Sequence, residues 1–122
     1  MERHEKLWEV DHGHRVRSVM LRGDQVITCN EENSVIVLAL QSGEELHRLE
    51  HPSRCYTADL SPNKSLLAVA CHSAVVLWDI KKGVKIEQFN LGTGVHDVRF
   101  NTTGNRLIAG LYDGEVFKIE LA

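Results

Sequence analysis

The chain repeats one pattern three times at a spacing of about 40 residues, a period typical of stacked repeat proteins. The segment Val16–Leu21 recurs as Cys55–Leu60 and again as Val95–Phe100. Apolar residues precede the three copies at matching offsets. Because one unit of this length buries little surface by itself, the three copies are expected to stack and to share a core.

Each repeat has the residue pattern of β-strands. Apolar residues alternate or run continuously between turn signals, and β-branched residues are abundant, as in Val35–Leu38 and Ala74–Trp78. Asp113-Gly114 is a typical hairpin turn, because glycine adopts positive φ without strain. We therefore predict four strands in each repeat: residues 5–10, 15–22, 25–30 and 34–39, then 45–50, 55–60, 66–71 and 74–79, then 84–90, 95–101, 106–111 and 115–120.

The second repeat carries a family resemblance. It contains the turn Ser61-Pro62-Asn63 and closes on Trp78-Asp79, a pattern that resembles the WD-repeat family of β-propellers. Leu38-Ala39 and Ile119-Glu120 replace the Trp-Asp pair in the other repeats. The resemblance implies an all-β fold of three four-stranded antiparallel blades, forming a partial propeller or one part of an assembled ring. Residues 5–122 would be a single array, with repeat 1 at 5–43, repeat 2 at 44–83 and repeat 3 at 84–122.

Blades of this family are held by a side-chain network of His, Ser or Thr, Asp and Trp. The resemblance implies a partial network in the second repeat, with a serine where the family has aspartate. Its candidate members are His51, Thr57, Ser73, Trp78 and Asp79. The other repeats lack most of these residue types, so apolar packing is expected to hold their blades together.

The resemblance also implies a binding surface on the narrower top face of the blades. Residues near the start of the first inner strand of each repeat, and residues just before each hairpin, line this face in the family. The candidates are Arg15, Arg17, Arg54, Tyr56 and His96 from the strands, and Glu31, His72 and Tyr112 from the hairpins. Arginine and aromatic side chains commonly anchor protein interfaces. We therefore expect a non-catalytic scaffold or adaptor that binds other proteins or peptides through the top face or the outer strands.

Two alternatives for the function stay open. Val16–Val19 is similar to a strand of F-box/WD substrate receptors in which an arginine at the position of Arg17 reads a phosphorylated degron. With Arg15 and Arg54 nearby, this similarity implies the substrate-recognition part of a ubiquitin ligase, with phosphopeptide binding. The other alternative is a structural set of blades that completes a larger propeller.

The number of repeats bears on assembly. Propellers close with about four to eight blades, so three blades leave two faces uncovered. The chain is then expected to be a fragment of a longer propeller, to form a homodimer with a six-bladed ring, or to dock onto another protein's incomplete propeller. Residues 5–10, as an outer strand, would complete the sheet begun by residues 95–120.

Composition narrows the classes of function. A net charge of −3 gives no basic footprint, so no nucleic-acid partner is expected. The chain has no nucleophile elbow, phosphate-binding glycine loop or His-Glu-x-x-His motif, so neither an enzyme nor a cofactor is expected. His12-Gly13-His14 supplies at most two ligands, and we expect no metal site.

The cysteines and the apolar runs indicate the compartment. Cys29, Cys55 and Cys71 lie on predicted strands without metal-binding spacing, so we expect buried, reduced thiols. The charged start of the chain does not resemble a signal peptide, and no apolar run approaches the ~18 residues of a membrane helix. A cytoplasmic or nuclear protein without a membrane partner is therefore expected.

Overall fold

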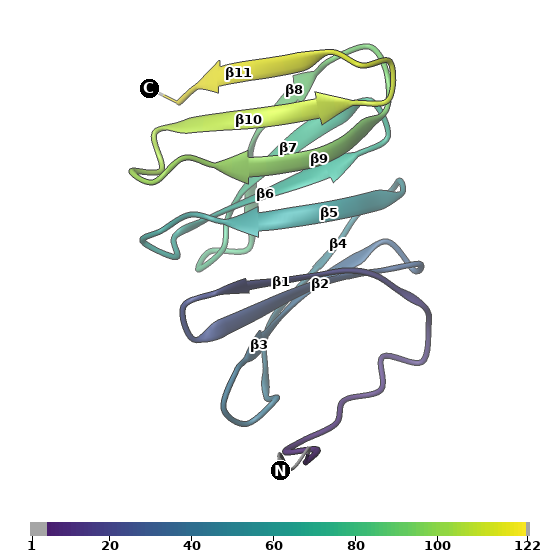
Figure 1. Cartoon of the computed structure of the whole chain (residues 1–122), viewed down its shortest axis with the longest axis vertical. Coiled ribbons are helices and arrows are strands. Elements are labelled where there is room, and N and C mark those ends of the chain that lie inside the picture. The colour runs from purple at the N-terminus through teal and green to yellow at the C-terminus, as the bar shows by residue number, and fades with distance from the viewer. Residues whose placement is uncertain (1–4, 122) are drawn as a thin grey trace, which may run out of the picture.

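The computed structural model describes residues 5–121. Within this range the chain forms eleven strands and no helix. Figure 1 shows the strands gathered into three twisted antiparallel sheets that follow one another along the long axis of the molecule. The all-β fold class expected from the repeats is thereby confirmed.

Every sheet is a meander, so strands that are neighbours in sequence are neighbours in space. The first sheet holds β1 (Val16–Arg22), β2 (Gln25–Asn30), β3 (Ser34–Ala39) and β4 (Glu45–Glu50). The second holds β5 (Cys55–Leu60), β6 (Leu66–Cys71), β7 (Ala74–Asp79) and β8 (Val84–Asn90). The third holds β9 (Val95–Phe100), β10 (Arg106–Leu111) and β11 (Val116–Glu120). The outer strand of each four-stranded sheet thus comes from the following sequence repeat.

The same hairpin recurs in all three sheets. Asn33, Ser73 and Gly114 occupy the connections β2–β3, β6–β7 and β10–β11, with φ of 65°, 98° and 94°. Asparagine and glycine adopt this left-handed conformation more readily than other residues, which explains two of the three choices. Ser73 is a rarer occupant, in the hairpin that is one residue shorter than its counterparts.

The prediction of a strand at residues 5–10 is wrong. This segment lies beside the first sheet, at the far end of the array from β11 (Figure 1). Trp8 packs against the cluster of Val26, Ile36 and Leu38, and its indole N–H donates to the carbonyl of Leu40 at 2.7 Å. The contacts of Trp8 therefore hold this segment against an apolar face of the first sheet. Within the described residues the third sheet has three strands.

The core lies between the sheets. On β6, Leu67 and Val69 face the first sheet, whereas Ala68 and Ala70 face the third. Successive side chains of a strand point to opposite faces, so a strand that is buried on both sides is apolar throughout. The second sheet is therefore the central layer of the array, and it packs against a neighbour on each side.

A buried carboxylate joins the three sheets. Asp59 on β5 is 0% exposed and accepts two hydrogen bonds of 2.8 Å from the guanidinium of Arg22 on β1. The backbone N–H of Phe100 on β9 donates to the same carboxylate at 2.8 Å. The hydrogen bond to Asp59 raises the pKa of Arg22, so the guanidinium stays charged. One side chain thus fixes the spacing of the first strands of all three sheets.

Candidate functional site

The first strands of the three sheets bring their amino-terminal ends to one edge of the array. β1, β5 and β9 lie side by side and run in the same direction (Figure 1). At this edge their side chains surround a depression of about 590 Å³, here called the top depression. It is lined by Arg15, Val16, Arg17, Ser18, Arg54, Tyr56, Thr57, His96, Asp97, Arg99 and Tyr112.

Six of the eight side chains predicted for the top face line this depression, namely Arg15, Arg17, Arg54, Tyr56, His96 and Tyr112. Glu31 lies at the edge beside Arg15, where its carboxylate accepts a hydrogen bond of 3.3 Å from the Arg15 backbone N–H. His72 does not line the depression; it lines a separate cavity between the β4–β5 connection and the second sheet. The structure therefore brings most of the predicted surface together and separates His72 from it.

Aromatic rings line the depression near the third sheet. The rings of Tyr56 and Tyr112 meet edge to face with centroids 5.8 Å apart, and His96 meets Tyr112 in the same manner at 4.9 Å. A Cβ atom at Gly94 would lie 2.6 Å from the Tyr112 ring, so only glycine leaves room for the ring in this position. The three rings offer an amphipathic contact surface with both ring faces and ring edges.

The charge around the depression is strongly positive. The side chains of Arg15, Arg17 and Arg54 make no ion pair or side-chain hydrogen bond with any residue in the range 5–121. Arg99 is paired with Asp97 at 2.5 Å. Three unpaired guanidinium groups give this edge a local positive charge on a chain of net charge −3.

Sequence reasoning missed Asp97 and Arg99. Asp97 aligns with Ser18 and Thr57 of the other repeats, whose hydroxyl oxygens lie 3.0 Å apart across the first two sheets. All three positions face the depression. Extending the repeat alignment by one residue beyond Arg17, Tyr56 and His96 would have identified Asp97. Arg99 aligns with Met20 and Asp59, which do not line the depression, so the alignment gives no signal for it.

The predicted side-chain network is formed only in part. The Trp78 indole N–H donates to Nε2 of His51 at 2.9 Å, and the two rings pack edge to face. The hydroxyl of Thr57 pairs with Ser18 instead. Ser73 donates its backbone N–H to the Cys71 carbonyl, and Asp79 accepts from the backbone N–H of Lys82 at 3.1 Å. Of the five candidates, His51 and Trp78 are the two that the structure joins.

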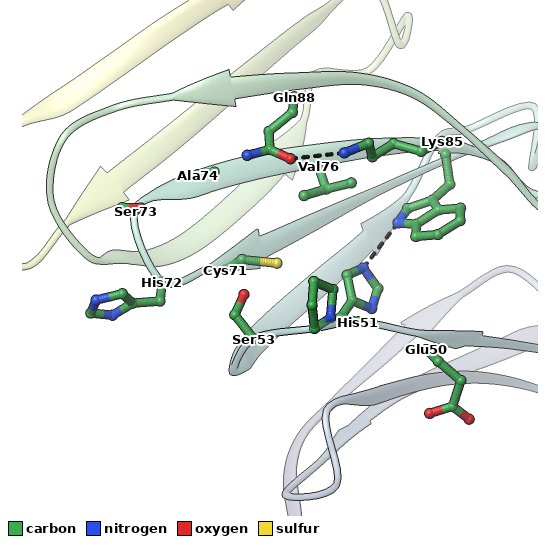
Figure 2. Close-up of a pocket in the computed structure, with 12 residues that line it drawn as sticks. Glu50, His51, Ser53, Cys71, His72, Ser73, Ala74, Val76, Lys85 and Gln88 are labelled. Carbon is green, nitrogen blue, oxygen red and sulfur yellow. Dashed lines mark hydrogen bonds between the residues drawn. The ribbon is translucent and has the colours of Figure 1, made fainter.

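A second cavity of about 300 Å³ lies beside this pair. Figure 2 shows it between the β4–β5 connection and the strands of the second sheet, with His51, Cys71, Val76 and Gln88 among its lining residues. Donor atoms of His51, Cys55 and Cys71 lie within 4.8 Å of one another, the arrangement within the described residues that comes nearest to a metal-ligand set. Histidines 12 and 14 instead contact Thr28 and Glu32.

Protonation of His51 is expected to destabilise the folded chain. Burial lowers the pKa of His51 below its ordinary value of 6.5. His51 therefore binds a proton more readily in the unfolded chain than in the folded chain. The folded chain loses stability as the pH falls from about 6.5 through the lower pKa of His51 in the folded state. Urea denaturation between pH 7.5 and 5 should show this loss. The loss of stability should be smaller in His51→Gln than in the wild type, and an equal loss in the two proteins would contradict the assignment.

Comparisons with known proteins agree with the fold. No family model matches the chain. Eukaryotic translation initiation factor 3 subunit I from Neosartorya fischeri is 33% identical over 89 residues, which covers 71% of this chain and 26% of that protein. The protein of the same name from Schizosaccharomyces pombe is 28% identical over 89 residues, covering 71% of this chain and 27% of that protein. The chain thus spans about a quarter of the length of the curated relatives it matches.

A solved structure shows the same fold. The β-propeller domain of Cps50 (Swd1) from Myceliophteria thermophila matches with a TM-score of 0.76 and 17% sequence identity, over 88% of this chain and 36% of that chain. The described residues contain no helix long and apolar enough to cross a membrane. The repeat of about 40 residues, the meander sheets, the Trp78-Asp79 pair and these likenesses agree. The chain belongs to the WD-repeat family of β-propeller proteins.

Proposed function

We propose that the chain is a non-catalytic protein-interaction module that binds an anionic segment of a partner protein in the top depression. The observation that carries this proposal is the group of three unpaired arginines, Arg15, Arg17 and Arg54, beside exposed aromatic rings. Guanidinium groups bind carboxylates and phosphates through paired, charge-assisted hydrogen bonds, and tyrosine supplies contact area at low entropic cost. Glu31 limits the site at one edge by repelling like charge.

The relatives support a partner that is a protein. The curated relatives are named as subunits of a translation initiation factor, so they work within an assembly. By likeness to them we propose protein partners for this chain, and the cytoplasm or the nucleus as its compartment. No relative reported above is described as a ubiquitin-ligase receptor, so the F-box alternative gains no support from them.

The double substitution Arg17→Ala and Arg54→Ala is expected to abolish capture of the physiological partner while leaving the fold intact, because both side chains are exposed and unpaired. The matched control is the double substitution Lys81→Ala and Lys82→Ala. Both lysines are exposed in the turn after β7, at the opposite end of the second sheet. Quantitative mass spectrometry of proteins captured by each variant gives the comparison. Equal capture by the wild type and the arginine variant would overturn the proposal.

The chemistry of the anion is settled by a separate titration. The same arginine cluster favours a phosphorylated segment, because a phosphate carries about two negative charges and three acceptor oxygens. Two synthetic peptides derived from the captured partner, one phosphorylated at serine and one with serine unmodified, are titrated against the wild-type chain. Tighter binding of the phosphorylated peptide, lost in Arg17→Ala, supports phosphopeptide recognition. Equal binding of both peptides assigns the site to carboxylate side chains.

The two ends of the array are proposed to pack against further blades. Val19 and Leu21 on the outer side of the first sheet are 65% and 56% exposed, and Ile108 and Val116 on the third sheet are 41% and 70% exposed. Such faces are buried in closed propellers. Light scattering of the purified chain measures its mass. Twice the chain mass supports a six-bladed homodimer, whereas a monodisperse monomer at high concentration excludes self-assembly.

A further inference from the structure

Two cysteines lie opposite each other on neighbouring strands of the second sheet. Cys55 on β5 and Cys71 on β6 are direct partners in the antiparallel register, and their sulfur atoms lie 3.9 Å apart. Directly opposed residues of an antiparallel pair have Cα atoms about 4.5–5.5 Å apart, which falls within the range that a disulfide spans. The thiols are free in this structure. A rotation of the side chains would therefore bring the sulfurs to bonding distance without a large movement of the strands.

The two sulfurs differ in access. Cys71 lines the second cavity, and Figure 2 shows its side chain directed into that space. Cys55 is 0% exposed and does not line the cavity. The third cysteine, Cys29, is also fully buried, and burial raises its pKa to about 12. A small solute that enters the cavity thus meets Cys71 rather than Cys55, whose sulfur lies 3.9 Å from that of Cys71.

His51 favours sulfur chemistry over metal binding at this cluster. Its Nε2 accepts the indole N–H of Trp78, so the neutral ring carries its proton on Nδ1. A metal ion needs a lone pair, and Nδ1 offers none while the Trp78 bond persists. Nδ1 is buried and has no hydrogen-bond partner within the described residues. A ring nitrogen of His51 lies within 4.8 Å of both sulfurs, so the imidazole lies beside the pair of thiols.

We propose that Cys55 and Cys71 are a reversible oxidation site that forms a disulfide on exposure to hydrogen peroxide. The Cys71 thiolate attacks one peroxide oxygen; the S–O bond forms, the O–O bond breaks, and the departing hydroxide takes a proton to become water. The Cys55 sulfur then attacks the sulfenic sulfur of Cys71; the S–S bond forms, the S–O bond breaks, and the second water leaves with the Cys55 proton. Two thiols lose two electrons and one peroxide becomes two waters.

Access to the cavity assigns the attacking role to Cys71, and the local electrostatics agree with it. The hydrogen bond from the Cys55 thiol lowers the pKa of Cys71, and the positive charge of Lys85 acts in the same direction. The same hydrogen bond, together with burial, raises the pKa of Cys55. The thiolate is the nucleophile, so Cys71 is the attacking residue and Cys55 the resolving residue. This site is separate from the top depression and does not depend on the proposed function.

Peptide mapping tests the proposal directly. The purified chain is treated with hydrogen peroxide, its remaining thiols are blocked, and it is digested with trypsin. Cleavage after Arg54 and Lys64 places Cys55, Cys71 and Cys29 on separate peptides. We expect a cross-linked pair that contains Cys55 and Cys71, reversed by dithiothreitol. Cys29→Ser should form it at the wild-type rate.

Single variants separate the two roles. In Cys55→Ser, dimedone should trap a sulfenic acid on Cys71, because no resolving thiol remains. In Cys71→Ser, Cys55 should stay reduced. Tryptophan fluorescence recorded on every sample verifies that the chain remains folded. A bridge to Cys29, dimedone labelling of Cys55 in Cys71→Ser at the rate of Cys71 in Cys55→Ser, or fully reduced thiols in the folded, peroxide-treated wild type would each overturn the proposal.

Discussion

Replacing Asp59 with alanine is expected to lower the free energy of unfolding by about 3 kcal/mol, because two groups lose their partner at once. The backbone N–H of Phe100 would be left buried without an acceptor, and the guanidinium of Arg22 would lose both of its carboxylate bonds. Arg22 is 36% exposed, so water recovers part of its cost. The larger part of the loss comes from the contact between β5 and β9.

Urea denaturation measures this loss, and the chain offers a matched control. Asp24 and Lys64 also connect the first and second sheets, but their ion pair lies on the surface. Exposed pairs of this kind contribute about 0–1 kcal/mol, so Asp24→Ala should have a small effect. Equal destabilisation by Asp59→Ala and Asp24→Ala would contradict the role of Asp59 as the side chain that joins the three sheets.

Leu107→Ala is expected to destabilise the chain by about 2–5 kcal/mol, the usual cost of a cavity at a fully buried leucine. Leu107 on β10 is 0% exposed and packs with Val98 and Phe100 in the cluster between the second and third sheets. The next residue, Ile108, points to the opposite face of the same strand and is 41% exposed. Ile108→Ala should therefore cost well under half as much.

The pair of variants tests which face of the third sheet is packed. Chemical denaturation of both proteins under one set of conditions gives the two free energies. A larger loss for Ile108→Ala than for Leu107→Ala would mean that the outer face is the buried one. Such a result would indicate that a further blade or a second copy already covers it in solution.

The strands were predictable because their signals are local. Alternation and turn residues fixed the bounds of β2, β3, β6 and β7 to the residue. The failed strand at residues 5–10 had the same apolar spacing as its counterparts in the later repeats. The spacing of apolar residues does not reveal whether a neighbouring strand is available for hydrogen bonding. Trp8 instead packs against an apolar face of the first sheet.

The candidate site was predictable only for residues that occupy equivalent positions in the repeats. Tyr56 and His96 are equivalent residues of successive repeats, so their convergence follows from stacking. The hydrogen bonds from Arg22 and Phe100 to Asp59 link residues that are not equivalent in the repeats, so the repeat pattern does not predict them. The pairing of Cys55 with Cys71 depends on strand register, which the sequence alone left unassigned.

Hydrogen exchange of the chain with and without its captured protein partner tests the central claim, that partners bind in the top depression. We expect slower exchange on binding at residues 15–18, 54–57 and 95–97 and at Tyr112, the segments that surround the depression. Slower exchange confined to the edge strands β4, β8 and β11, with no change at the amino-terminal ends of β1, β5 and β9, would contradict this claim.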